Sequence, residues 1–513
     1  MKRAHLSSAE VARGDLRTRV AVMLADGWRL ALVAAHEDPP GDGPATGLRV
    51  VYVLLKPVGL RAELTVHVPV DDVWVPSLAA ESYPASRFER EMRDTFGIDP
   101  RGHPQPTRLV HHAHWPEDFH PLRRDCAEPL LRPDAEGFPF LQVEGPGIYE
   151  IPVGPIHAGL IEPGHFRFSV LGETIVRMML RLWFTHRGLE RHMAGREPSA
   201  AIGLAERISG DTAVGHTLAY AQAVEDALGI PVPEDARIAR GLLLELERLY
   251  NHVGDLGAIV NDVAYDIAHQ HTQRLKESLL RHHAEVTGHR LLRGGITIGG
   301  ASLRRPVDVG LIQSVAAEAD KIADLALNHV VVLNRLTGTA ILTREQARHI
   351  GTLGYVVRAS GWAVDARTDH PFVDLGDAFE VVTESGGDVL ARFVVRAREI
   401  QVSARVIADL AARLGGSLGV VAEAVGASAA LGVSGSPGDM DVPRAGLGVV
   451  EAWRGTLTHR VELTAAGRLS RVKIVDPSWF TWPALPVALA DTIVPDFPLA
   501  NKSFNLSYAG NDL

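Results

Sequence analysis

Apolar residues recur at three- and four-residue spacing along most of the second half of the chain, and this pattern is the main constraint on its fold. Such spacing predicts helices that bury one face against their neighbours. The predicted helical segments are 200–229, 233–267, 273–292, 307–336 and 389–414. Irregular glycine-rich segments separate them. From 446 to 475 the pattern changes to that of strands, with a hairpin expected around 465–467.

The first 80 residues show a different pattern, that of short strands rich in β-branched side chains. Strands are expected at 18–24, 28–34, 49–55 and 62–68, with Ala25-Asp26-Gly27 as a hairpin turn between the first two. A helix over 87–96 is expected to end at Gly97. The proline- and glycine-rich stretch 129–155 marks a domain junction. The predicted fold class is therefore α+β, with a small α/β domain (1–135) followed by a large, mainly helical domain with a minor β portion (136–513).

Composition excludes several classes of protein. The net charge of −10 argues against a nucleic-acid binder, because such proteins carry a basic face. A single cysteine, Cys126, excludes an internal disulfide and a cysteine-held metal cluster or structural zinc site. No glycine-rich fingerprint for a dinucleotide follows a predicted strand. This chain by itself is therefore expected to bind no cofactor.

No segment resembles a signal peptide or a membrane span. The nearest candidate, 415–435, consists mostly of small residues and is interrupted by Glu423. Any link to a membrane is therefore expected to come through partner subunits, with the chain peripheral on the cytoplasmic side.

The segment 154–168 is the strongest candidate for functional chemistry. It carries two histidines, one glutamate and one arginine between glycines and prolines, which disfavour helix formation. A long helical pattern, 176–193, is expected to follow it. Polar loops packed against helices often line reaction cavities, whereas a turn whose histidines only satisfy backbone groups is the alternative.

Four histidines lie close together before the junction, at 111, 112, 114 and 120. They lack regular metal-ligand spacing and a companion carboxylate, so a docking strap is favoured over a metal site.

Motifs on both sides of the junction resemble known families. The residues Glu89-Arg-Glu-Met-Arg-Asp94, followed by 97–109 and Pro121-Leu-Arg-Arg-Asp125, resemble the small hydrophilic subunit of respiratory complex I. The loop 154–168, Thr185-His-Arg-Gly188, 206–216, 358–367 and 451–459 resemble the large subunit of group 4, formate-hydrogenlyase-type [NiFe] hydrogenases and the homologous quinone-site subunit of complex I.

The departures from the hydrogenase pattern concern its metal ligands. The family holds nickel and iron with two Cys-x-x-Cys pairs, because soft thiolates suit these metals. The matching positions here are Ser209, Thr212, Ser507 and Gly510. Hydroxyls and a glycine do not replace four thiolates, so no [NiFe] centre is expected.

The resemblance to complex I implies a set of acid–base residues. It pairs a histidine of the loop 154–168, which we call the opening loop, with an aspartate of a later helix at the quinone headgroup. The matching residues here are His165 and Asp262. Glu162 matches the glutamate that passes protons in hydrogenases. Complex I carries a tyrosine in the turn that here reads 208–212. Asp211 is the ionisable residue in its place and is expected to serve proton passage together with Glu162.

Four further residues match positions near a cofactor. Arg187, with His186 beside it, matches the arginine near the last iron–sulfur cluster, which a separate small subunit holds. Arg358 and Arg454 lie in the later motifs, where Arg454 and Glu451 are also read as a structural ion pair.

These features predict a subunit of a membrane-associated oxidoreductase complex related to complex I and hydrogenases. Its expected partners are an iron–sulfur small subunit and antiporter-like membrane subunits, and a quinone is the candidate substrate. The alternative is a non-catalytic scaffold between the iron–sulfur subunit and the membrane arm. An active hydrogenase is the third hypothesis, and it requires nickel.

Overall fold

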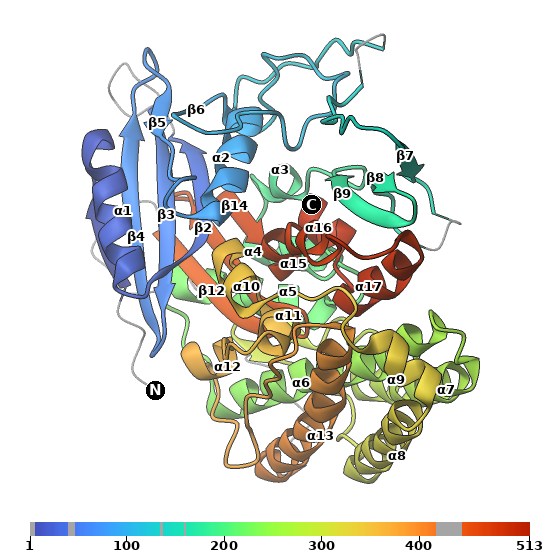
Figure 1. Cartoon of the computed structure of the whole chain (residues 1–513). Helices are drawn as coiled ribbons and strands as arrows, with labels where there is room; N and C mark the ends of the chain where they lie inside the picture. The colour runs from blue at the N-terminus through green and yellow to red at the C-terminus, as the bar shows by residue number, and fades with distance from the viewer. Residues whose placement is uncertain (1–5, 39–46, 134–136, 158–160, 417–443) are drawn as a thin grey trace.

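The computed structural model describes residues 6–38, 47–133, 137–157, 161–416 and 444–513. A strand-rich N-terminal part lies on one side of the molecule, and a group of long helices lies at the other end (Figure 1). The segments nearest the C-terminus run between them. The predicted α+β class is confirmed.

The N-terminal sheet has the strand order β1-β4-β3-β2. Strands β2 (Arg29–Glu37), β3 (Leu48–Lys56) and β4 (Leu60–Val68) pair antiparallel, and β1 (Leu6–Glu10) pairs parallel to β4. The strands predicted at 28–34, 49–55 and 62–68 are confirmed. The helix predicted to end at Gly97 is α2 (Tyr83–Phe96), and Gly97 adopts the left-handed conformation with φ 73°.

The strand predicted at 18–24 is wrong, because this segment lies in helix α1 (Leu16–Ala25). Only Leu16 and Val20 of this helix are buried, and they are four residues apart, so both lie on one helical face. The β-branched residues that favoured a strand therefore do not determine the local structure, and Ala25-Asp26-Gly27 ends a helix instead of forming a hairpin.

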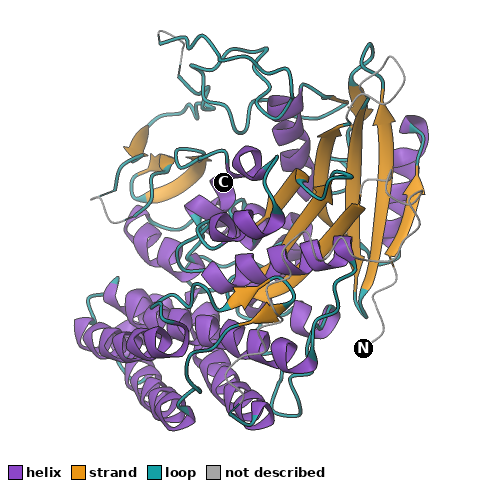
Figure 2. Cartoon of the chain, turned by 180° about the vertical axis from the view of Figure 1, so that it is seen from behind, coloured by secondary structure: helices purple, strands orange, loops and turns teal. Residues whose placement is uncertain are grey.

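A second sheet connects the two parts of the molecule. It consists of β12 (Arg444–Ala452), β13 (Gly455–Leu463) and β14 (Leu469–Val475), all antiparallel, as the strand pattern at 446–475 predicted. Every residue of β13 is buried. Buried ion pairs join this sheet to the N-terminal part, including Arg460 with Glu63 at 3.1 Å and Lys473 with Glu91 at 2.5 Å. Figure 2 shows the strands of both sheets running across the molecule.

The long helices confirm most of the predicted helical segments. They are α5 (Ala213–Leu228), α6 (Glu234–Asn261), α7 (Asp266–Thr287), α8 (Val309–Leu327) and α13 (Val389–Leu414). Helix α6 is buried along most of its length, because it packs against α13 and α7. Helix α5 covers β12 and β13.

Short elements complete the described chain. The helical ones are η1 (Arg13–Asp15), α3 (Leu189–Met193), α4 (Pro198–Ala205), α9 (Val330–Leu336), α10 (Arg344–Ile350), α11 (Gly354–Ala359), α12 (Ala366–Asp369), α15 (Pro477–Thr481), α16 (Ala484–Ala488), η3 (Val494–Asp496), α17 (Phe497–Phe504) and α18 (Tyr508–Asp512). The extended ones are the pairs β5 (Trp74–Pro76) with β6 (Asp99–Arg101) and β10 (Ile296–Thr297) with β11 (Gly300–Ala301).

The helix predicted over 176–193 is also wrong. The segment forms β9 (Thr174–Arg181) and, after a loop, the short helix α3. Strand β9 pairs antiparallel with β8 (His165–Leu171), which in turn pairs with β7 (Ile148–Val153). The tight turn at Gly172, where φ is 61°, brings β9 back onto β8, and pairing with β8 satisfies the backbone that a helix would otherwise satisfy internally.

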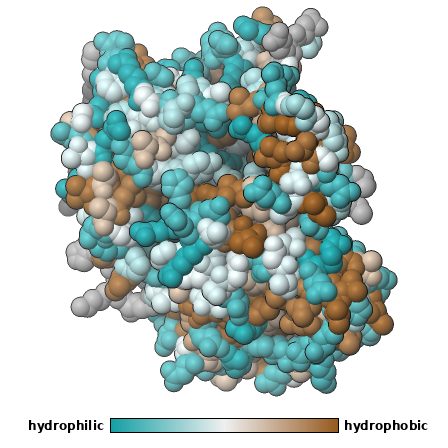
Figure 3. Space-filling view, in the orientation of Figure 1, coloured by the Kyte–Doolittle hydropathy of each residue, from teal (hydrophilic) through white to brown (hydrophobic). Residues whose placement is uncertain are grey.

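Exposed apolar side chains gather in two places on the face seen in Figure 3, over the β7–β9 sheet and over the ends of α7 to α9. Leu171 and Val176 are exposed in the first place, and Val330 and Val331 in the second. Among the described helices none is long and apolar enough to cross a bilayer. Most of the small-residue segment 415–435 lies outside the described residues.

Candidate functional site

Three of the four positions that match the hydrogenase metal ligands meet at the C-terminal helix. Ser209 lies in the loop before α5, and Ser507 is the N-cap of α18. Their hydroxyl oxygens are 2.9 Å apart, and both residues are buried. The Ser507 hydroxyl also accepts the Gly510 backbone N–H at 2.8 Å. Segments almost three hundred residues apart in sequence are thus joined by a direct hydrogen bond.

The hydrogen bonds of this cluster all run in one direction from donor to acceptor. A carboxylate only accepts hydrogen bonds, so the Ser209 hydroxyl donates to Asp211 Oδ1 at 3.0 Å. Its single proton is then used, and Ser507 must donate to Ser209. The chain of hydrogen bonds therefore runs from the Gly510 N–H through Ser507 and Ser209 to Asp211. We call these four residues the hydroxyl chain.

Arg454 holds the acidic end of the hydroxyl chain. Its guanidinium binds Asp211 in bidentate fashion, at 2.6 and 2.7 Å. The Thr212 hydroxyl donates to the same carboxylate at 3.0 Å and accepts the Trp453 indole N–H at 3.1 Å. Burial alone would raise the pKa of Asp211, but the Arg454 charge and the two hydroxyls lower it to about 2. Asp211 therefore stays ionised at neutral pH, which makes it an anchor for Arg454.

The residues at the positions that match the hydrogenase metal ligands do not fit a nickel–iron centre. The hydroxyls of Ser209, Thr212 and Ser507 are already committed to one another and to Asp211. A Cβ atom at Gly510 would lie 2.6 Å from Asp476 Oδ2 and 2.9 Å from Ser507 Oγ, so no larger side chain fits there without rearrangement. Hard hydroxyl oxygens are also poor ligands for metals that are otherwise held by thiolates.

A buried histidine pair lies behind this site. His216 Nε2 is 3.1 Å from Asp476 Oδ2, and His216 Nδ1 is 3.1 Å from His459 Nε2. All three residues are almost fully buried. Because Asp476 Oδ2 also points at Gly510, the pair connects the hydroxyl chain with the interior of the β12–β14 sheet. His216 and His459 were visible only as parts of motifs. The position of His216, one helical turn after Thr212, is the signal that places it at the site.

The two predicted proton donors both have an unsatisfied polar atom. His165 begins β8, donates from Nδ1 to the Gly154 carbonyl at 3.2 Å, and has no partner for Nε2 in the described chain. Asp262 caps the C-terminus of α6, and its buried Oδ2 likewise has no partner there. Burial raises the pKa of Asp262, while Lys502 and His269 oppose the shift. His165 and Asp262 do not hydrogen-bond to each other, so their pairing stays a prediction.

Glu162 and the Thr185–Gly188 loop converge on α18. Glu162 accepts the Ala509 N–H at 2.9 Å, and His186 Nδ1 donates to the Asp512 carbonyl at 2.6 Å. Arg187 donates to the carbonyls of Arg207 and Ile208, the residues immediately before Ser209. The opening loop, this loop and the hydroxyl chain are therefore one connected structure.

The sequence did not predict the actual ion-pair partners. Arg454 pairs with Asp211, whereas Glu451 pairs with Arg358 at 2.8 Å, so the reading of Arg454 and Glu451 as a pair is wrong. Arg358 is completely buried and also binds Glu399 at 2.8 Å. Because its contacts are ion pairs inside the protein, it serves as a structural centre between α11, α13 and β12.

The predicted histidine strap packs through aromatic contacts. Trp115 and Phe119 stack with ring centroids 5.0 Å apart, and His111 packs against both rings at 5.9 and 5.6 Å. His120 Nδ1 donates to the Asp94 carbonyl at 3.0 Å. The described part of the chain contains no group of three or more potential metal ligands.

Comparison with known proteins identifies three matching families. Residues 10–129 match the model of the 30 Kd subunit of respiratory-chain NADH dehydrogenase, and residues 268–512 match that of its 49 Kd subunit. Residues 187–255 match nickel-dependent hydrogenase.

Individual relatives show the same combination. Formate hydrogenlyase subunit 5 of Escherichia coli (strain K12) is 34% identical over 481 residues, which cover 90% of this chain and 81% of the relative. A subunit of the NADH-quinone oxidoreductase of Phocaeicola vulgatus is 28% identical over 72% of this chain and 76% of its own. A chain of the membrane-bound sulfane sulfur reductase, an archaeal respiratory membrane complex, has a TM-score of 0.59 at 21% identity, covering 72% of this chain and 99% of its own.

Proposed function

The chain belongs to the family of group 4 hydrogenase-like large subunits that are fused to a complex I small hydrophilic subunit domain, and from this premise we propose a role without a [NiFe] centre. As a member of this family it is an oxidoreductase subunit of a membrane-bound, hydrogenase- or complex I-like complex. The proposed role is to form, with an iron–sulfur small subunit, the cavity in which electron arrival is coupled to protonation.

The observation that carries the proposal is the hydroxyl chain. Ser209, Ser507 and Gly510, which match metal-ligand positions of the hydrogenases, lie close together as metal ligands would. Hydrogen bonds and the Asp211–Arg454 ion pair, and not a metal, connect this site. Glu162, matched to proton passage, contacts α18 beside it, and His165, matched to proton donation, begins β8 three residues later. This arrangement retains acid–base residues after loss of the metal ligands.

A quinone is the proposed proton acceptor, since its reduction by two electrons takes up two protons at its two oxygens. Because Nδ1–H of His165 is committed to a carbonyl, His165 donates from Nε2 only when protonated. Asp262 is favoured in its protonated, donating form by burial. His165 Nε2 and Asp262 Oδ2 are therefore available to bind a polar ligand. Glu162 then returns protons to these two residues after they have donated.

Further subunits are proposed from the relatives, which belong to membrane-bound complexes. We expect an iron–sulfur small subunit and antiporter-like membrane subunits, with this chain attached peripherally on the cytoplasmic side. The exposed apolar side chains over β7–β9 and α7–α9 offer surface for contacts with such subunits.

The test is electron transfer to a quinone analogue in the purified intact complex, together with metal analysis. His165→Ala and Asp262→Ala are expected to lower the rate roughly a hundredfold or more, the usual contribution of a positioned proton donor. His67→Ala and Asp320→Ala, exposed residues of the N-terminal sheet and of α8, are the matched controls. Stoichiometric nickel in the complex, or unchanged rates in both site variants, would refute the proposal.

The scaffold alternative is favoured by a specific observation. Asp211 and Arg358 are held in ion pairs, as structural residues are. A scaffold predicts that the His165 and Asp262 variants retain full electron transfer, whereas disruption of the hydroxyl chain releases partner subunits.

A further inference from the structure

Most buried arginines in the described chain are paired with carboxylates. Arg240 binds Glu225 at 2.5 Å, and Arg396 binds Asp255 at 2.9 Å. Such pairing is the rule for buried charges, because an unpaired charge in a protein interior is costly.

Six arginines near the histidine strap, two of them buried, are not paired in this way. They come from α2, the strap, β9 and α3, and none of them forms a salt bridge within the described residues. Their hydrogen bonds go to backbone carbonyls or neutral side chains. We call this group the arginine rim; it consists of Arg87, Arg90, Arg93, Arg108, Arg181 and Arg191.

The two innermost members are almost completely buried. Arg181 donates to the carbonyls of Leu109 and His111, and Arg87 donates to the Trp479 carbonyl and to Asn511 Oδ1. Both guanidinium groups flank the Trp183 ring, at 5.8 and 5.4 Å from its centroid. Burial lowers the pKa of each to about 10, so both remain charged at neutral pH.

The nearby carboxylates do not neutralise the positive charge of the arginine rim. Asp94 accepts three backbone N–H groups of the strap, at 2.8 to 3.3 Å, and Asp512 accepts the N–H and hydroxyl of Thr185. Glu117 is the further carboxylate in the cavity beside Arg108, and Asp99 lies 3.9 Å from Arg101. Arg187 adds another guanidinium that donates to carbonyls, so seven arginines are opposed by only these four carboxylates, in a chain whose net charge is −10.

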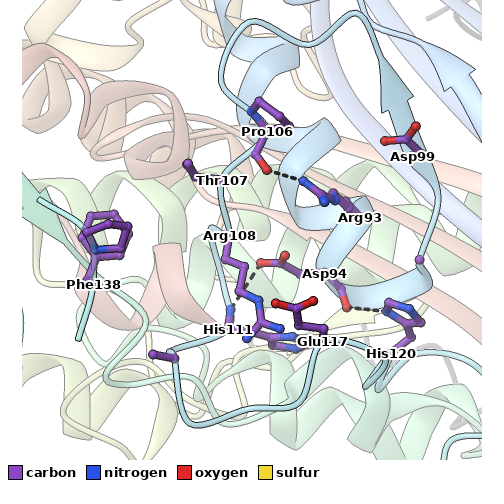
Figure 4. A pocket seen from close by; sticks show the side chains of 13 residues that line it. Arg93, Asp94, Asp99, Pro106, Thr107, Arg108, His111, Glu117, His120 and Phe138 are labelled. Carbon is purple, nitrogen blue, oxygen red and sulfur yellow. Dashed lines mark hydrogen bonds between the residues drawn. The ribbon is translucent and has the colours of Figure 1, made fainter. Parts of the chain in front are cut away.

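The same face also contains two cavities. A cavity of about 560 Å³ is lined by Arg93, Arg108, His111, Glu117 and Phe138, among others. Figure 4 shows Arg93 and Arg108 beside this cavity, with the Arg93 guanidinium bound to the Pro106 carbonyl. A second cavity of about 250 Å³ reaches Arg181. A surface of this shape admits a protruding segment of another protein.

We propose that the arginine rim is the docking surface for an acidic contact face of the iron–sulfur partner subunit. The inference rests on the proposed function, and it adds the chemistry that holds the partner. Carbonyl acceptors fix the guanidinium groups without cancelling their charge, so the charge remains available to a partner. An acidic face of the partner neutralises this positive charge. Its binding also holds the segment around Arg187 against the iron–sulfur cluster of the partner. Association is then salt-dependent, because exposed charge pairs are screened by ions.

The test measures retention of the partner on the tagged full chain as KCl is raised. The double variant Arg93→Gln/Arg191→Gln removes two exposed members of the rim. The partner's affinity is expected to fall roughly tenfold with the loss of two exposed ion pairs, so its release occurs at lower salt. Arg93→Lys/Arg191→Lys keeps the charge and is expected to retain the partner. Arg274→Gln/Arg405→Gln, which removes exposed arginines paired with Glu318 and Glu380, is the matched control.

The outcomes separate the inference from the proposed function. Release of the partner from the glutamine variant alone supports the inference. If that variant retains the partner like the unmodified chain, or if the lysine variant loses it equally, the docking role of the charge is refuted while the proposed function stands. If no iron-containing partner binds the unmodified chain even at low salt, both fall.

Discussion

Replacing Ser507 with alanine tests whether the hydroxyl chain stabilises the C-terminal helix. The Ser507 hydroxyl makes two hydrogen bonds in a buried place, as acceptor from the Gly510 N–H and as donor to Ser209. The first is the N-cap of α18, and loss of such a cap costs about 1 kcal/mol. The second is a buried neutral hydrogen bond, also worth about 1 kcal/mol. The expected loss of stability is therefore about 2 kcal/mol.

Hydrogen exchange measures this loss where it occurs. If α18 opens locally, a change of about 2 kcal/mol accelerates exchange of the Gly510 amide roughly 30-fold, because every 1.4 kcal/mol is a factor of ten. Mass spectrometry of peptides that cover 505–513 reports this rate. Ser314→Ala, an exposed serine on α8, is the control and should leave exchange unchanged.

Two results would contradict the reasoning. Unchanged exchange in the Ser507→Ala variant would show that the hydroxyl chain contributes nothing to the stability of α18. Nickel-dependent protection in the unmodified chain would show that a metal, and not the hydroxyls, joins the two segments. We expect the exchange rates to be the same whether or not nickel is supplied during expression.

Two other predictions concern buried charges. Arg460→Met leaves Glu63 buried without its cation, which is expected to lower the free energy of unfolding by about 3–5 kcal/mol. The double variant Arg460→Met/Glu63→Gln should recover part of this stability in urea denaturation. Absence of any recovery would contradict the pairing. Glu89 is fully buried and has no salt bridge to an arginine or lysine of the described chain, and burial raises its pKa to about 7. A raised carboxyl pKa means that the folded state binds the proton more tightly, so stability falls as pH rises from about 4.5 to 7, by about 3 kcal/mol. Glu89→Gln should remove that fall, and an identical pH profile in both proteins would refute the assignment.

The helices of the second half were predictable because their apolar pattern extends over many turns. The segment 389–414 coincides with α13, since its long buried face leaves little choice of structure. The errors fell on segments with weak local signals. Helix α1 buries only Leu16 and Val20, and β9 owes its structure to pairing with β8, a contact that no local pattern in 176–193 reveals.

The candidate site was predictable in its positions but not in its contacts. The resemblance placed Ser209, Thr212, Ser507 and Gly510 together, and the structure joins Ser209, Ser507 and Gly510 through hydrogen bonds. It did not reveal that Asp211 is the partner of Arg454, because the sequence offers Glu451, in the same motif, as the carboxylate to pair with it. Long-range partners such as Asp476 sit at isolated positions, and only the folded chain brings them to the site.

The buried arginines of this chain have two kinds of surroundings, one with carboxylate partners and one with neutral partners. Around Arg358 and Arg460, guanidinium groups are neutralised inside the chain, so these regions need no partner to be stable. At the arginine rim the same side chain is fixed by carbonyls and neutral side chains, so under the docking proposal the partner supplies the opposite charge. Arg187 donates to the two carbonyls immediately before Ser209 of the hydroxyl chain, and Arg191 of the rim lies on α3, which follows Arg187 in the chain. Under the docking proposal, binding of a charged partner therefore acts on the loop that carries the hydroxyl chain.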